Sequence, residues 1–140
     1  MGSPLIPSIR YNDAPKAVQW LCGAFGFVEH FVAPDGEGGI AHAQLVLGDS
    51  MLMLGSARED DFGQLQKPLE DPEGTVSQSL YVVVGNVDAH YENALSHGAI
   101  IVKEPEDQGY GGRLYTCRDP EGNLWSFVSY DLWLPVRADV

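Results

Sequence analysis

The stretch that decides the fold lies near the end of the chain, where residues 118–125 read RDPEGNLW. Asp119-Pro120-Glu121-Gly122 predicts a type I turn followed by glycine, because proline fixes its own φ and glycine accepts the left-handed conformation. The segments 112–118 and 123–129 flank this turn and are rich in apolar residues. They predict a β-hairpin.

Working outward from the hairpin, the same order of elements occurs twice. The strand-like segment 8–13 precedes a helical pattern ending at Gly26, and the segment 79–84 precedes a second one ending at Gly98. The offsets are 79 − 8 = 71 and 98 − 26 = 72, so one residue is gapped. This periodicity predicts two copies of a strand–helix–strands unit.

Both helices carry start and stop signals. Asp13 is a plausible N-cap, Pro15 lies in the first turn and Gly26 ends the first helix. The expected buried positions of the first helix are Ala14, Ala17, Val18, Leu21, Cys22 and Phe25. The second helix is expected from about Asp88 to His97, with Tyr91, Ala94 and Leu95 buried and Gly98 as its stop.

The remaining strands follow from alternation. In 40–47 the apolar set is expected to face the helix, which leaves His42, Gln44 and Val46 on the opposite side. Gly48-Asp49 turns the chain into 50–54, and 99–102 predicts another short strand. The fold class is therefore α+β: two βαβββ modules forming a curved mixed sheet with a central cavity and with helices on the outer face. We expect one domain, with module 1 at about 4–57, a connector at 58–76, module 2 at 77–130 and a tail at 131–140.

The composition and net charge limit the partners and the compartment that we expect for the protein. Eight Lys and Arg against 20 Asp and Glu give a formal net charge of −12, which disfavours nucleic acid and anionic lipid as partners. This charge favours a cationic ligand or simply serves solubility. No apolar run approaches the roughly 18 residues that a membrane span needs, and no basic, then apolar leader opens the chain. Cys22 and Cys117 therefore suggest free thiols in a reducing cytoplasm.

At this point the chain resembles the vicinal oxygen chelate superfamily, which includes glyoxalase I, bleomycin-resistance proteins and extradiol dioxygenases. The first helix ends in Phe25-Gly26-Phe27, and the DPEGN hairpin matches the family's turn before its last strand. The resemblance covers roughly residues 4–130. It implies that metal-dependent relatives would place ligands at the positions of Ile6, Met53, Ser79 and Ser126. These side chains are unsuited to a divalent ion, so we expect no metal and no cofactor at these positions.

The same resemblance directs attention to the inner faces of the strands. Arg10 can grip a carboxylate or phosphate, or it can form a structural salt bridge. His42 can contact a ligand or be a satisfied inner-face histidine. The segment 104–113 is the expected rim, unless it is only a solvated acidic loop. The predicted ligand-binding residues are Arg10, His42, Gln44, Met53, Ser79, Tyr81, Tyr110, Arg113, Thr116 and Ser126.

The functional expectation is a cytoplasmic, bleomycin-resistance-like protein that binds and sequesters a small molecule such as an antibiotic or toxic metabolite. By family habit we expect a homodimer. The alternative is a glyoxalase-like lyase or isomerase, or a dioxygenase-type enzyme, with non-standard metal ligands or an acid–base site at His42. A third possibility is an interaction module with a filled cavity. The sequence leaves the sign of charge on the ligand open, since Arg10 favours an anion and the net charge favours a cation.

Overall fold

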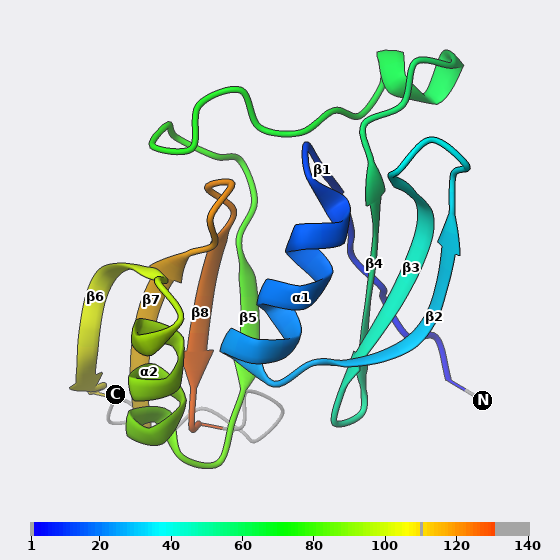
Figure 1. Cartoon of the computed structure of the whole chain (residues 1–140). Coiled ribbons are helices and arrows are strands. Elements are labelled where there is room, and N and C mark those ends of the chain that lie inside the picture. Colours follow the sequence, from blue (N-terminus) through cyan, green and yellow to red (C-terminus); the bar gives the residue numbers. More distant parts are fainter. Residues whose placement is uncertain (1, 110, 131–140) are drawn as a thin grey trace. The chain divides into compact units, whose positions relative to one another are not determined.

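The computed structural model describes residues 2–109 and 111–130 of the chain (Figure 1). These residues form two compact units, 1–70 and 71–140, which we call module 1 and module 2. Each contains one helix and a four-stranded mixed sheet. The predicted α+β class and the repeated βαβββ order are therefore confirmed, whereas a cavity shared by the modules stays a prediction. No helix within the described ranges is long and apolar enough to cross a membrane.

Module 1 has the sheet order β1-β4-β3-β2. Its strands are β1 (Ser8–Tyr11), β2 (Val28–Pro34), β3 (Ile40–Leu47) and β4 (Ser50–Ser56). β1 runs parallel to β4, and the other neighbours are antiparallel. The helix α1 (Ala14–Phe25) contacts all four strands.

The ends of α1 form as the sequence predicts. The Asp13 side chain accepts a hydrogen bond from Lys16 N, and Gly26 adopts a left-handed φ of 89°. Five of the six residues expected to be buried are buried, but Cys22 is only half-buried and Ala24 takes its place in the core. The buried face of α1 therefore lies slightly closer to Ala24 than the sequence predicts. The small side chain of Ala24 lets the helix approach the sheet closely.

Module 2 repeats this arrangement with the order β5-β8-β7-β6. Its elements are β5 (Leu80–Val83), α2 (Val87–Ser96), β6 (Ile100–Asp107), β7 (Arg113–Arg118) and β8 (Leu124–Val128). Between β7 and β8, the DPEGN turn is closed by a bond from Gly122 N to Asp119 O, with Gly122 at φ 96°. The buried Trp125 and Phe127 form the core beneath α2, as their register predicts.

Two local expectations were wrong. β6 extends to Asp107 rather than ending at Val102, so half of the expected rim loop is strand. Leu95 is 43% exposed instead of buried.

The connector contains a short 3-10 helix, η1 (Asp61–Gln64), which belongs to module 1. Just after η1, Gln66 Nε2 donates a hydrogen bond to Ser8 O of β1 at 2.7 Å. Residues 131–140, the expected tail, lie outside the described residues.

Candidate functional site

The candidate site in module 1 is the sheet face opposite α1, which we call the open face of module 1. Alternation places Leu52 and Leu54 of β4 in the core, so Met53 between them faces the other way. Met53 pairs with Ser8 of β1 and with Gln44 of β3, and Gln44 pairs with Phe31 of β2. The predicted residues Arg10, His42, Gln44 and Met53 therefore share one face.

Arg10 is the most unusual group on this face. It is only 9% exposed, and its Nη1 donates to the carbonyl oxygen of Ser56 at 3.2 Å. Its Nε is buried without an acceptor, and no ion pair joins it to a carboxylate of residues 2–109 or 111–130. Burial lowers the pKa of Arg10, and repulsion from the Arg58 cation lowers it further. The structural salt bridge that the sequence left open is therefore not formed in the described part of the chain.

His42 and Gln44 of β3 form a polar pair on the same open face as Arg10. Gln44 Nε2 lies 3.1 Å from His42 Nε2, and an amide nitrogen can only donate, so this ring nitrogen accepts. The ring of Phe31 lies 6.2 Å from that of His42 and is half-exposed. Phe31 is an aromatic wall residue that sequence reasoning missed, because a bulge between Glu29 and Phe31 shifts the register of β2.

In module 2 the corresponding open face carries a row of hydroxyl groups. Ser126 pairs with Tyr81 of β5 on one side and with Thr116 of β7 on the other. The hydroxyl oxygens of Thr116 and Ser126 lie 2.8 Å apart and are buried, so one of the two hydroxyls donates a hydrogen bond to the other. Tyr81 is 56% exposed and presents its ring to a ligand more readily than the two hydroxyls do. Ser79 is exposed and precedes β5 by one residue.

The predicted rim residues are placed differently. Arg113 lies on the helix-covered side of β7, where its Nε and Nη2 bond to Asp88 of α2 and its Nη1 bonds to Asp107. These two carboxylates raise the pKa of Arg113. The guanidinium is thus already occupied, and ligand contact by Arg113 stays a prediction that would require these bonds to break. Tyr110 lies outside the described residues.

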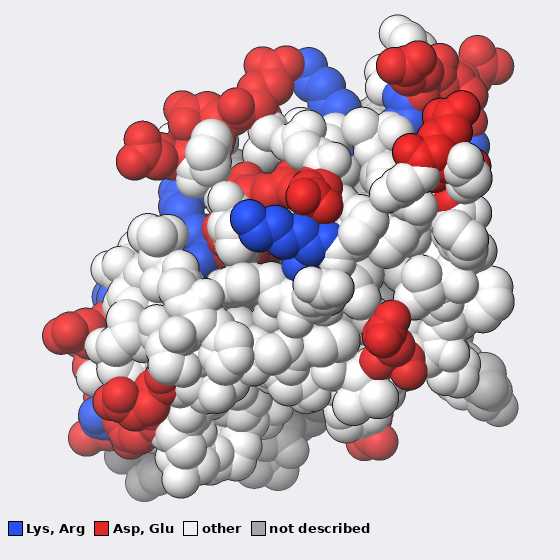
Figure 2. All heavy atoms as spheres, in the orientation of Figure 1, with Lys and Arg blue, Asp and Glu red and all other residues white. Residues whose placement is uncertain are grey.

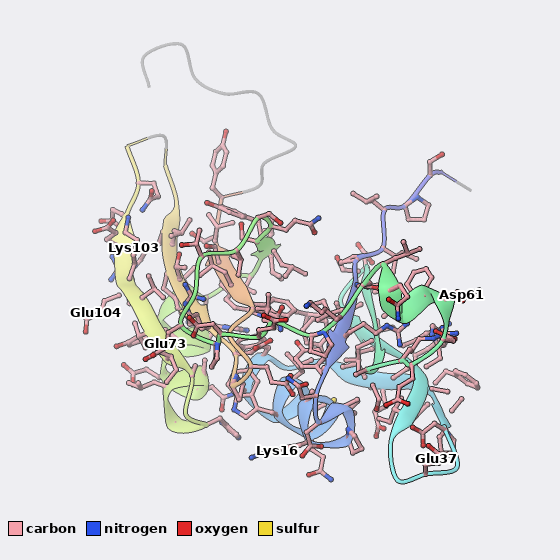
Figure 3. The ribbon with its side chains drawn as sticks, turned by 90° about the horizontal axis from the view of Figure 1, so that it is seen from above. Lys16, Glu37, Asp61, Glu73, Lys103 and Glu104 are labelled. Atoms are coloured by element: carbon pink, nitrogen blue, oxygen red, sulfur yellow. The ribbon has the colours of Figure 1, made fainter. Side chains whose placement is uncertain are left out.

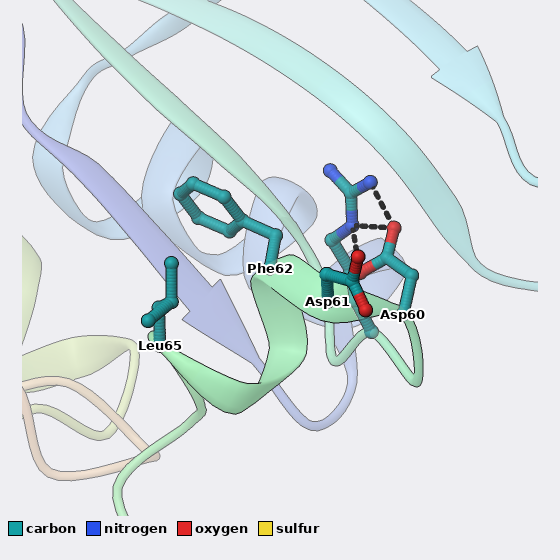
Figure 4. A pocket seen from close by; sticks show the side chains of 5 residues that line it. Asp60, Asp61, Phe62 and Leu65 are labelled. Atoms are coloured by element: carbon teal, nitrogen blue, oxygen red, sulfur yellow. Dashed lines mark hydrogen bonds and ion pairs between the residues drawn. The ribbon is translucent and has the colours of Figure 1, made fainter.

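A pocket in module 1 was not anticipated from the sequence. It measures about 490 Å³, opens broadly to solvent and is lined by Arg58, Asp60, Asp61, Phe62 and Leu65 (Figure 4). Arg58 pairs with Asp60, which raises the pKa of Arg58 and lowers that of Asp60. The polar, proline-bearing connector gave no periodic signal here, so only the folded chain shows that its apolar residues gather.

Among the charged side chains on the visible surface, acidic groups are more prominent than basic ones (Figure 2). They gather over the η1 segment in that view, and Figure 3 shows Asp61 projecting from η1 and Glu37 from the β2–β3 loop. Lys103 and Glu104 project from the edge strand β6 (Figure 3). The labelled acidic side chains Glu37, Asp61 and Glu104 thus project from a loop, from η1 and from the edge strand β6.

The order of elements, the left-handed glycine after α1 and the DPEGN hairpin all point to one family. The sequence profile of the Glyoxalase/Bleomycin resistance protein/Dioxygenase superfamily matches residues 6–127. The chain belongs to this superfamily. An uncharacterised protein of Mycobacterium bovis is 32% identical over 136 residues, which span 95% of this superfamily member and 84% of that relative.

Solved structures agree with this membership. TioX from Micromonospora sp. ML1 superposes with a TM-score of 0.71 at 32% identity, covering 91% of this chain and 98% of TioX. A superfamily member from Sphaerobacter thermophilus superposes at 0.69 with 20% identity, covering 91% of this chain and 97% of that one. The second likeness concerns the fold alone, whereas TioX is also similar in sequence.

The superfamily includes metal enzymes, but the side chains of this member do not fit a metal ion. Of the ligand-equivalent positions, Met53 and Ser126 lie on open faces, while Ile6 and Ser79 precede β1 and β5. A thioether, an alkyl group and two neutral hydroxyls lack the imidazole or carboxylate donors that divalent ions prefer. Among residues 2–109 and 111–130, no three His, Cys, Asp or Glu side chains are grouped so that they could hold an ion.

Proposed function

We propose that this superfamily member binds a small organic anion on the open face of module 1 and holds it without chemical change. The contacts would come from Arg10, His42, Gln44 and Met53, with Phe31 as an aromatic wall. For module 2 we propose ligand contacts of its own, from Ser79, Tyr81, Thr116 and Ser126, with Tyr110 and Arg113 at the rim of that module. The proposed role is sequestration of an antibiotic or toxic metabolite.

The observation that carries this proposal is the state of Arg10. A buried guanidinium with an unsatisfied Nε costs stability, because it has lost water without gaining an acceptor. A carboxylate or phosphate group on a ligand would supply two acceptors to the planar guanidinium. The neighbouring thioether of Met53 and ring of Phe31 suit the apolar body of such a ligand.

The enzyme alternative needs a different chemistry. A lyase, isomerase or dioxygenase of this superfamily would need non-standard metal ligands or a proton transfer through His42. Elemental analysis of the purified protein separates these possibilities. A stoichiometric divalent metal, together with loss of turnover after chelation, would favour the enzyme and contradict sequestration.

The binding proposal is tested with a matched pair of probes, indoleacetate and the neutral indoleacetamide. We expect amide NMR signals of β1 and β4 to shift on titration with indoleacetate, and the amide probe to bind more weakly. Arg10→Met keeps the apolar stem but removes the charge, and should weaken indoleacetate binding at least about tenfold, the usual effect of a lost charge-assisted hydrogen bond. Recovery of unaltered probe would support sequestration.

Lys16→Met is the matched control, because it removes one exposed positive charge from α1. We expect it to leave the dissociation constant within about twofold, since exposed charges contribute little. If Arg10→Met and Lys16→Met lost the same affinity for indoleacetate, the loss would be due to the change in net charge and not to Arg10 itself. An unchanged constant in Arg10→Met would refute the assignment of Arg10.

Three further properties belong to the same proposal. We propose that the two modules make up one domain, that the protein works in the cytoplasm and that it forms a homodimer. Size-exclusion chromatography with light scattering measures the mass of the assembly. A monomer of 15.3 kDa would contradict the dimer, and cell fractionation tests the location.

A further inference from the structure

We propose that the pocket at η1 is a second binding site, specific for an organic ammonium ion that carries an apolar group. The pocket belongs entirely to module 1 and is lined by Arg58, Asp60, Asp61, Phe62 and Leu65 (Figure 4). This proposal does not depend on the anion site at Arg10. It assigns a role to the connector, which the superfamily resemblance leaves without one.

The first observation is that the segment around η1 has a defined shape. Asp60 Oδ1 accepts from Arg58 Nε at 3.0 Å and from Gly63 N at 3.2 Å, so one carboxylate ties both sides of the turn together. A β-carbon at Gly63 would overlap the backbone carbonyl of Arg58, so this close approach requires glycine. The bond from Gln66 to Ser8 then anchors the segment to β1. The pocket walls are therefore preorganised, which lowers the entropic cost of binding.

The second observation is that this segment exposes large apolar side chains. Phe62 is 46% exposed and Leu65 is 81% exposed, and both line the pocket. The guanidinium carbon of Arg58 lies 5.6 Å from the centre of the Phe62 ring, which leaves the rest of that ring to a ligand. A ligand with an apolar body would remove this surface from water, which is the main favourable contribution to binding in such a pocket.

The third observation gives the charge of the ligand. The Arg58 cation is neutralised by two-pronged hydrogen bonding to Asp60. The carboxylate of Asp61 has no hydrogen bond or ion pair within the described part of the chain. A cation is therefore attracted to this pocket, and the net charge of −12 raises its local concentration. An ammonium group beside an aromatic ring also gains from the ring's quadrupole.

The test uses tryptamine, which is an ammonium ion at neutral pH, and tryptophol, which replaces the ammonium with a hydroxyl. In amide NMR titrations of the full chain we expect tryptamine to shift signals within 58–66 and to saturate in the millimolar range, as its size allows. Asp61→Asn and Phe62→Ala should each weaken tryptamine about three- to fivefold. Tryptophol should bind more weakly than tryptamine to the natural chain, and the difference between the two probes should be smaller for Asp61→Asn.

Glu59→Gln is the matched control, because it removes a neighbouring exposed charge that does not line the pocket. It should leave the tryptamine constant within about twofold. The proposal is overturned if tryptamine gives no saturable shift, if its shifts centre outside 58–66, or if Glu59→Gln and Asp61→Asn act alike. The Arg10→Met variant should still bind tryptamine, so failure of the anion site and failure of this site are distinguishable.

Discussion

The guanidinium of Arg10 lies directly against the backbone of Gly55, the residue that pairs with it across β1 and β4. A β-carbon at position 55 would overlap Arg10 Nη1 and would stand 2.9 Å from the carbonyl oxygen of Ala41. Arg10 can therefore lie across β4 only because residue 55 has no side chain. The position of the proposed anion-binding group is thus set by a glycine on a neighbouring strand.

Gly55→Ala should consequently displace Arg10. We expect a loss of about 1–3 kcal/mol in the free energy of unfolding, because the β-carbon overlaps a backbone carbonyl as well as a movable side chain. We also expect weaker binding of indoleacetate, by a factor similar to that for Arg10→Met. Urea unfolding and NMR titration measure the two effects.

Gly85→Ala provides the control for this substitution. A β-carbon at Gly85 meets no atom within 4 Å. Its unfolding free energy should change by less than about 1 kcal/mol, and its affinity for indoleacetate should remain that of the natural chain. If Gly55→Ala binds the probe normally, Arg10 does not need its present position for binding.

Two glycines of module 2 have a left-handed φ, and comparing substitutions at them separates the cost of backbone strain from the cost of steric overlap. At Gly98 (φ 89°) a β-carbon would meet no atom within 4 Å, whereas at Gly122 (φ 96°) a β-carbon would lie 2.5 Å from Pro72 Cα. Gly98→Ala should therefore cost only the strain, about 1–2 kcal/mol. Gly122→Ala should cost clearly more, measured by urea unfolding. Equal losses would show that Pro72 moves aside freely.

Asp119 holds the hairpin turn by accepting several hydrogen bonds. Its Oδ1 accepts from Glu121 N and Asn123 N, and its Oδ2 accepts from the buried Trp125 Nε1 at 3.2 Å. Asp119→Ala should lower the unfolding free energy by about 2–4 kcal/mol, because a buried indole N–H is left without an acceptor. Calorimetry checks this loss. Exposed Glu37→Ala should be nearly neutral, and a similarly neutral Asp119→Ala would contradict the role of the carboxylate.

The Cys117 thiol makes the free energy of unfolding depend on pH in the alkaline range. Burial, and secondarily the negative charge of Asp119, raises the pKa of its thiol to about 12 from an unfolded value of about 8.5. The folded state therefore holds the proton more tightly than the unfolded state. This contribution is complete below about pH 8.5 and declines by at most about 1.4 kcal/mol per pH unit as the pH rises toward 12.

Urea unfolding between pH 8 and pH 10 measures this decline, and Cys117→Ala is the comparison that isolates it. The variant should lose less stability over this range than the natural chain. Burial raises the pKa of Tyr115, and the charge of Cys117 raises it further, so only the part due to burial is shared by both proteins and cancels in the difference. Parallel curves would mean that the thiol titrates normally in the folded protein.

Local sequence was sufficient for much of the fold. The N-cap at Asp13, the stop at Gly26 and the Asp119–Gly122 turn depend on neighbouring residues alone, and each formed where its pattern predicts it. Alternation also placed His42 and Gln44 on the same side of β3, because a strand's period of two is independent of its partners. These features are local, so no tertiary contact was needed to predict them.

Other features depended on partners distant in the sequence. The extension of β6 to Asp107 is determined by pairing with β7, and the placement of Arg113 beside Asp88 depends on how α2 covers the sheet. His90 of α2 bonds to the Tyr115 hydroxyl at 2.6 Å, and its ring lies 4.1 Å from the Phe127 ring. A short amphipathic helix does not specify its rotation as sharply as a long one does, because fewer apolar residues mark its buried face.

The amino-acid sequence alone determined the repeated βαβββ order, which follows from residue type and spacing, and it carried the resemblance to the superfamily, which in turn implied that four ligand-equivalent positions are unsuited to a metal. Tertiary structure alone decided that Arg10 lies buried over Gly55 with no counter-ion among the described residues, and that Phe62 and Leu65 gather in one pocket. The reason is physical: hydrogen bonding and burial depend on which atoms meet in space, and those atoms come from segments up to 58 residues apart.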